Sequence, residues 1–157
     1  MGKVERIYIA AGKRQAVESI DSAELEAGKG IVGDRYHTLA LQYLEKGMTV
    51  PDNHISFIDQ DNIDEFVDRH SLEADYGDFR RSVITRGIDL NALVGKHFKA
   101  GDALCYGVEL CEPCSQLARI IHKAVLPEMA ETAGLRAIIV ESGGLKPGDS
   151  ICAIDRD

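Results

Sequence analysis

The chain has 157 residues, a length typical of one domain with a hydrophobic core of its own. Its composition is 45% hydrophobic and 28% charged, an ordinary balance that argues against disorder and low complexity. The net charge of −8 argues against non-specific nucleic-acid binding, which needs a basic surface. We therefore expect a single domain over residues 1–157 that binds no nucleic acid.

The apolar runs indicate the compartment of the protein, and the compartment indicates the redox state of its cysteines. None approaches the roughly 20 residues of a membrane span, and the first residues lack the apolar core of a signal peptide. This pattern predicts a cytoplasmic protein with no membrane contact. In that compartment cysteines are mostly reduced thiols, here Cys105, Cys111, Cys114 and Cys152.

The first half of the chain reads as short strands and loops. Apolar runs predict strands over 4–11, 54–58 and 81–86. The Gly- and Glu-rich segment 24–30 and the polar segment 71–80 predict loops. Between them, Asp61 or Asn62 is expected to cap a helix whose apolar face carries Ile63, Phe66 and Val67.

The second half contains more strand than helix. Asp89 is expected to cap a short helical turn that ends at Gly95, and 115–132 reads as helical with an interruption near Pro127. Further strands are predicted over 97–99, 103–109, 135–141 and 150–154. Turns are predicted at Gly101-Asp102, at Gly143-Gly144 and over 146–149.

These elements define a fold class. Short strands outnumber helices and do not alternate regularly with them, which argues against a doubly wound parallel sheet. We predict a mostly β protein, a closed or partly open β-barrel with a few short decorating helices.

The segment Cys111-Glu112-Pro113-Cys114 lies between a predicted strand and a predicted helix. A thiol near a helix N-terminus is favoured as the thiolate, the form that attacks sulfur and binds soft metals. Structural zinc is not expected, because a second cysteine pair and paired histidines are missing. A thioredoxin-like pair lacks its βαβ context. On residue pattern alone, two small buried cysteines are an equally open interpretation.

Basic residues form a second candidate set. In Gly33-Asp34-Arg35-Tyr36-His37, either Asp34 and Arg35 form a local ion pair, or Arg35 and His37 bind an anion in a pocket. Strand alternation would turn Arg80 and Arg81 to opposite faces. Arginine suits phosphate recognition, and the candidates are Arg35, Arg80, Arg81, Arg86 and Arg136, although each alone is an ordinary surface charge. Gly143-Gly144 lacks the features of a phosphate-binding loop.

The order of these motifs resembles the MOSC domain, the C-terminal domain of molybdenum cofactor sulfurases. The resemblance runs from Val4 to Ile154 and rests on four segments: Gly33-Asp34-Arg35-x-His37; Arg80-Arg81 with Gly87-Ile88-Asp89-Leu90-Asn91-x-Leu93-x-Gly95; Phe98-x-x-Gly101-Asp102; and Leu110-Cys111-Glu112-Pro113-Cys114.

The resemblance implies a barrel-like fold and a working cysteine. By motif position that cysteine is Cys114, which would ligate the molybdenum of a pterin cofactor or carry sulfur as a persulfide, with Cys111 in support. The same resemblance assigns the binding of the cofactor and its phosphate to Asp34, Arg35, His37, Arg81 and Arg136.

The resemblance also implies partners. The chain lacks the additional N-terminal domain of the amidoxime reductases and the pyridoxal-phosphate desulfurase domain of the sulfurases. A separate cysteine desulfurase or electron-donor protein is therefore expected. As an enzyme the chain would be a sulfur transferase or a molybdenum-dependent reductase of N-hydroxylated compounds. The alternatives are a non-catalytic module that delivers the cofactor and a thiol redox protein that uses Cys111 and Cys114.

Overall fold

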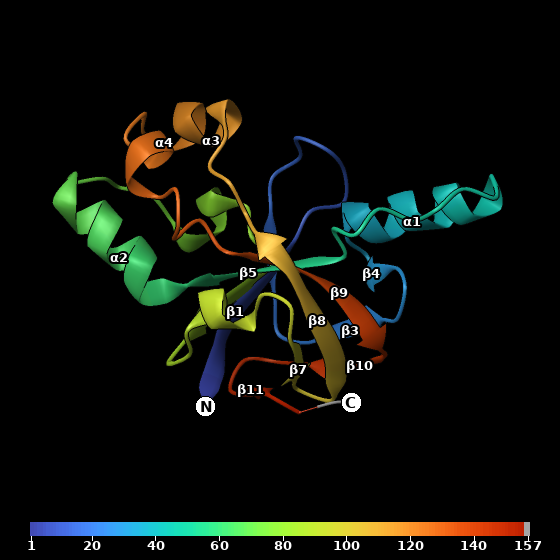
Figure 1. The fold of residues 1–157 in the computed structure, drawn as a ribbon. Helices are drawn as coiled ribbons and strands as arrows, with labels where there is room; N and C mark the ends of the chain where they lie inside the picture. Colours follow the sequence, from blue (N-terminus) through green and yellow to red (C-terminus); the bar gives the residue numbers. More distant parts are fainter. Residues whose placement is uncertain (156–157) are drawn as a thin grey trace.

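A computed structural model describes residues 1–155. Within them, seven strands close into a barrel in the order β11-β7-β8-β9-β5-β6-β1, with β1 pairing back onto β11 (Figure 1). These strands are β1 (Gly2–Ile9), β5 (Ile55–Asp59), β6 (Val83–Arg86), β7 (His97–Ala100), β8 (Ala103–Leu110), β9 (Leu135–Glu141) and β11 (Ser150–Ala153). The β5–β6 pair is parallel and the other barrel pairs are antiparallel. The predicted mostly β barrel is confirmed.

Shorter strands extend the barrel. β2 (Glu18–Ile20) pairs with β1, and a small second sheet joins β10 (Gly143–Leu145), β3 (Ala23–Glu26) and β4 (Gly30–Ile31). The loop predicted over 24–30 is therefore confirmed only for the turn 27–29, and the turn predicted at Gly143-Gly144 is wrong. Gly143 serves close approach rather than a turn, because a Cβ there would lie 2.4 Å from the Asp102 carbonyl carbon.

Short helices surround the barrel. They are α1 (Arg35–Glu45), α2 (Gln60–Arg69), α3 (Ser115–Ile120) and α4 (Val125–Glu128), with 3₁₀ helices η1 (Tyr76–Phe79) and η2 (Leu90–Leu93). Asp89 caps η2 as predicted. The cap of α2 is Asp59 rather than Asp61 or Asn62, since its carboxylate accepts hydrogen bonds from both of their backbone N–H groups. No helix in residues 1–155 is long and apolar enough to cross a membrane.

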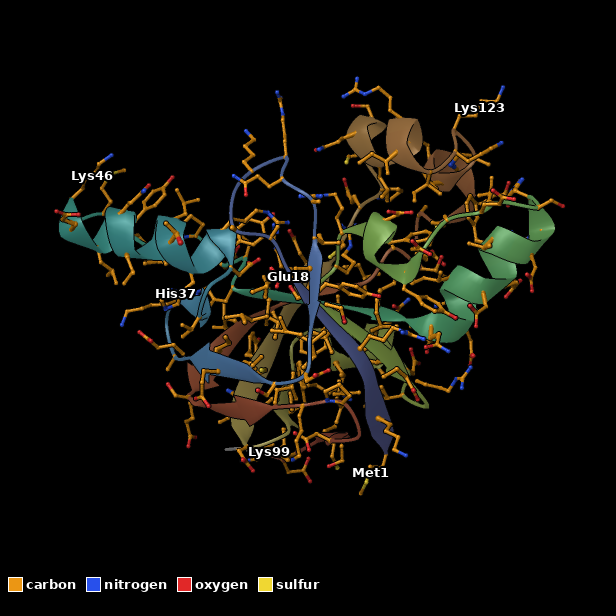
Figure 2. All side chains as sticks on the ribbon, turned by 180° about the vertical axis from the view of Figure 1, so that it is seen from behind. Met1, Glu18, His37, Lys46, Lys99 and Lys123 are labelled. Carbon is orange, nitrogen blue, oxygen red and sulfur yellow. The ribbon has the colours of Figure 1, made fainter. Side chains whose placement is uncertain are left out.

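One helical prediction needs correction, and one helix was not predicted. The break in the segment 115–132 lies over residues 121–124, and Pro127 is inside α4, in a first turn where its missing N–H costs little. Helix α1 is unpredicted because it has little apolar periodicity: only His37 and Ala40 of its residues are buried. Its far end projects away from the barrel (Figure 2, near Lys46).

Hydrophobic side chains form two separate cores. One fills the barrel, where Phe57 and Phe98 meet edge to face with ring centroids 5.4 Å apart. The other lies outside it, beneath α2, α3 and α4. Its buried members are Ile58, Ile63, Phe66, Phe79, Ile84, Leu117, Val125, Met129 and Ala133. This outer core fixes α3 beside the end of β8, and so places the segment 111–114 at the barrel rim (Figure 1).

Candidate functional site

A pocket of about 160 Å³ lies at the rim where β8 passes into α3. It is lined by Arg35, Tyr36, Arg80, Arg81, Cys114, Gln116, Leu117 and Ile120. Three predicted site residues from distant parts of the sequence, Arg35, Arg81 and Cys114, therefore share one cavity. We call it the Cys114 pocket.

Cys114 is the N-cap residue of α3. Its backbone is extended, its carbonyl accepts the Ala118 N–H at 3.0 Å, and its side chain makes no capping hydrogen bond. The Cys114 thiol is exposed and forms no disulfide with another cysteine of the described residues. It is therefore available to an incoming ligand or a donor sulfur.

Cys111 has a different environment. Its N–H donates to the Gly134 carbonyl at 2.8 Å, and its half-buried side chain packs against the outer core. Burial raises the pKa of the Cys111 thiol, while the nearby charges of Arg81 and Arg136 oppose that rise. The two cysteines are thus unequal, since Cys111 helps to fill the core and Cys114 faces the pocket.

Asp34 holds Arg35 in place. Its buried carboxylate accepts the Ala10 N–H at 2.9 Å, caps α1 through the Tyr36 N–H at 3.4 Å and pairs with the Arg35 guanidinium at 3.3 Å. The Arg35 guanidinium lies over the Tyr36 ring, 4.4 Å from its centroid. The local ion pair therefore exists and orients Arg35 at the pocket, while anion binding by Arg35 and His37 stays a prediction.

Two adjacent arginines, Arg80 and Arg81, line the Cys114 pocket together with Arg35. The Nε–H of Arg81 donates to the Ala133 carbonyl at 2.7 Å, and Arg80 donates to the Gln15 carbonyl at 3.0 Å. The alternation expected for this pair does not hold, because β6 begins only at Val83. Arg80 instead adopts a left-handed conformation, with φ 58°. Burial is the main cause that lowers the pKa of Arg80, and the nearby positive charge of Arg35 lowers it further.

Besides Asp34, which supports Arg35, two predicted residues do not line the pocket. His37 is a buried residue of α1, with Nε2 3.4 Å from a Glu26 carboxylate oxygen. Arg136 on β9 pairs with Glu109 and, at 3.5 Å, with Asp52. Neither residue lines the Cys114 pocket.

A second cavity of about 420 Å³ adjoins the first and shares Arg35 and Tyr36 with it. Its other lining residues are Ala11, Gly12, Lys13, Thr38, Leu39 and Gln42. The sequence offered no signal for it, since it forms between a loop and the unpredicted helix α1. We call it the α1 pocket.

A family model described as the MOSC domain matches residues 44–152, most of the chain. The chain belongs to the MOSC domain family. A search of curated proteins finds no match.

Solved structures share this MOSC fold. The YuaD protein of Bacillus subtilis is 18% identical, with a TM-score of 0.79 over 100% of this chain and 98% of that one. YiiM of Geobacillus stearothermophilus is 15% identical, with a TM-score of 0.74 over 99% of this chain and 76% of that one. YiiM of Escherichia coli is 17% identical, with a TM-score of 0.63 over 99% and 71%. At these identities the likeness establishes the fold alone.

Proposed function

We propose that this MOSC domain binds a phosphate-bearing molybdenum–pterin cofactor, with Cys114 as the protein ligand of the metal. The observation that carries the proposal is the convergence of an exposed thiol with three arginines in one pocket. Guanidinium groups suit phosphate, and thiolate is a soft ligand of the kind that such a metal prefers.

The size and chemistry of the cavities fit such a group. The Cys114 pocket alone is smaller than the roughly 300–1,000 Å³ usual for organic ligands, but the adjoining α1 pocket brings the space into that range. In residues 1–155 no three His, Cys, Asp or Glu side chains gather as a metal site. A metal held by Cys114 would therefore need ligands from the pterin or from solvent.

The roles of the chain's own residues follow from their anchors. Arg81, fixed on the Ala133 carbonyl, and Arg35, fixed by Asp34, present positive charge with little loss of side-chain freedom on binding. Arg80 adds a third charge, and the Tyr36 ring offers a flat apolar surface between the two cavities. When bound, the cofactor would supply two-electron redox chemistry at the metal.

A sulfur-carrier role is the second candidate, favoured by the exposure of Cys114 at the rim. The Cys114 thiolate would attack the outer sulfur of a donor persulfide, the donor S–S bond would break, and the donor thiolate would leave. Cys114 would then hold the transferred sulfur as its own persulfide. This exchange needs no oxidant, because sulfur passes from one thiol to another.

The test uses protein produced in cells that make the cofactor. We expect molybdenum by elemental analysis and pterin by fluorescence after oxidation, or cyanide-labile sulfur if the carrier role holds. The Cys114→Ser variant should lose the metal or the labile sulfur, while Cys111→Ser is the matched control and should keep it. Retention of the signal in Cys114→Ser contradicts the assignment.

Catalysis is tested separately from binding. Reduction of an N-hydroxylated base by the loaded protein, with a chemical electron donor supplied, would identify a reductase. Cofactor binding without turnover would instead favour a delivery module. Reversible formation of a Cys111–Cys114 disulfide under mild oxidation, detected by mass spectrometry, would favour the thiol redox alternative.

A further inference from the structure

Positive charge gathers at the end of the barrel that carries the Cys114 pocket. Lys13 and Arg14 lie in the loop 10–17, and Arg119 and Lys123 lie on α3 and the connection that follows it. Figure 2 shows this loop and the labelled Lys123 at the same end of the molecule. All four side chains are exposed. We call them the basic rim.

The basic rim lacks the neutralising partners found elsewhere. Within residues 1–155 none of its four side chains forms an ion pair or a side-chain hydrogen bond. Several arginines and lysines on other surfaces are paired with carboxylates, as in Arg69–Glu128, Arg86–Asp61, Arg136–Glu109 and Lys146–Asp149, whereas the unpaired Lys3, Lys46 and Lys96 lie far apart in the sequence. The rim therefore projects uncompensated positive charge into solvent.

This concentration is large for an acidic chain. Segments 10–17, 34–36, 80–81 and 111–124 contain seven of the 18 basic residues but only two of the 26 acidic ones. Of those two, Asp34 is buried against Arg35, which leaves Glu112 as the exposed carboxylate of the group. The remainder of the molecule is strongly negative. These four segments therefore carry a net positive charge, whereas the rest of the chain carries a net negative one.

We infer that the basic rim is a docking surface for a partner protein whose contact face is acidic. This inference extends the proposed function, since a bound partner would stand over Cys114 and could pass electrons or sulfur to it. Opposite charge on the two faces would speed their encounter and orient the partner toward the pocket.

A protein fits this surface better than nucleic acid or a lipid bilayer does. Ile120 and Leu126 are 46% and 44% exposed beside the rim, and apolar side chains surrounded by charge are typical of protein interfaces.

The probe is an acidic [2Fe–2S] ferredoxin, titrated against fluorescently labelled full-length protein and followed by anisotropy. The rim variant is Arg14→Gln/Arg119→Gln/Lys123→Gln, which leaves out Lys13 because that residue lines the α1 pocket. The matched control is Lys3→Gln/Lys46→Gln/Lys96→Gln, three exposed lysines elsewhere. Both variants lose three positive charges, so any difference between them reports where the charges lie.

We expect the wild type and the control to bind at an ionic strength of about 0.01 M and to weaken markedly at about 0.15 M, as the Debye length falls from about 30 to about 8 Å. The rim variant should bind about tenfold more weakly, or worse. Absence of ferredoxin binding at low salt, or equal loss in both variants, overturns the inference.

Two competitors complete the test. A single-stranded oligothymidine or a vesicle of anionic lipid that binds more tightly than ferredoxin would assign the surface to another partner and overturn the inference. The cofactor assay is independent of these titrations. A chain that binds ferredoxin through the rim but gains no molybdenum or labile sulfur refutes the proposed function alone, and the reverse result refutes the docking surface alone.

Discussion

At the scale of single residues, the cysteines differ in their surroundings more than in their sequence context. Cys105 is fully buried in the barrel, and burial raises its pKa to about 12. Cys111 is half-buried with a raised pKa, whereas Cys114 is exposed at the pocket. Thiol reactivity requires both access and ionisation. The folded protein should therefore distinguish these thiols chemically.

Differential alkylation tests this expectation. With limiting iodoacetamide near neutral pH, Cys114 should be modified first, Cys111 more slowly and Cys105 not until the protein unfolds. Mass spectrometry of the digested protein locates the label, and the same reaction in urea serves as the control, in which the differences should largely disappear. Faster labelling of Cys111 than of Cys114 would be inconsistent with the described burial.

Part of the candidate site is readable from the sequence. The motif order indicated Cys114, Arg35 and Arg81, and the structure brings these three together. The motif order did not distinguish these three residues from Arg136, which pairs with Asp52 and Glu109 outside the pocket. Both partners lie far from Arg136 in the sequence, and no local pattern reveals them. The position of Tyr36 in the lining of both pockets could not be predicted either, since it depends on how α1 packs.

At the scale of elements, Gly134 fixes the segment that leads into the site. Its φ is 118°, a conformation that favours glycine, and its carbonyl accepts the Cys111 N–H. A Cβ at this position would lie 2.3 Å from the Phe57 carbonyl oxygen on β5. The close approach of β5 to the start of β9 therefore depends on the missing side chain.

We expect Gly134→Ala to lower the free energy of unfolding by about 2–4 kcal/mol, because backbone strain and a clash with a carbonyl add together. Gly148→Ala is the matched control, as its φ is 95° with no atom near the added Cβ, and should cost about 1–2 kcal/mol. Urea denaturation measures both. Equal losses of unfolding free energy in the two variants would show that the clash of the added Cβ with the Phe57 carbonyl oxygen does not lower stability.

Elements with a strong apolar pattern were predictable and others were not. The barrel strands follow apolar runs, so they were found with errors of a few residues at their ends. β10 pairs with β3 across a long stretch of chain, and β4 forms a short hairpin with β3. The short, glycine-containing sequences of β4 and β10 look like turns. Long-range pairing overrides local propensity in such segments.

At the scale of the whole molecule, buried His54 links two barrel strands. It precedes β5, and its Nδ1 accepts the Ile139 N–H of β9 at 3.0 Å. Burial lowers the pKa of His54 below the ordinary value of 6.5, although the charge of Asp52 opposes the change. The folded protein therefore keeps this ring neutral at pH values where the unfolded chain protonates it.

Stability should consequently fall as the pH drops below 6.5 toward the folded pKa, since the unfolded state binds the additional proton. His54→Asn retains an acceptor but does not titrate, so its free energy of unfolding should change less between pH 7.5 and pH 5. Urea denaturation at those two values provides the comparison. An equally steep loss in the variant would assign the acid sensitivity to other groups.

The pairing of the first barrel strand with the last has a consequence for biosynthesis. Gly2 lies opposite Ile151, and Val4 exchanges backbone hydrogen bonds with residues 148 and 149. While the chain emerges from a ribosome, β1 has no β11 to pair with and exposes an unsatisfied edge to other nascent chains. Contacts of such high sequence separation also slow folding. Barrel closure must therefore wait until β11 has been synthesised, and the interval before it is when this protein is most open to aggregation and to chaperones.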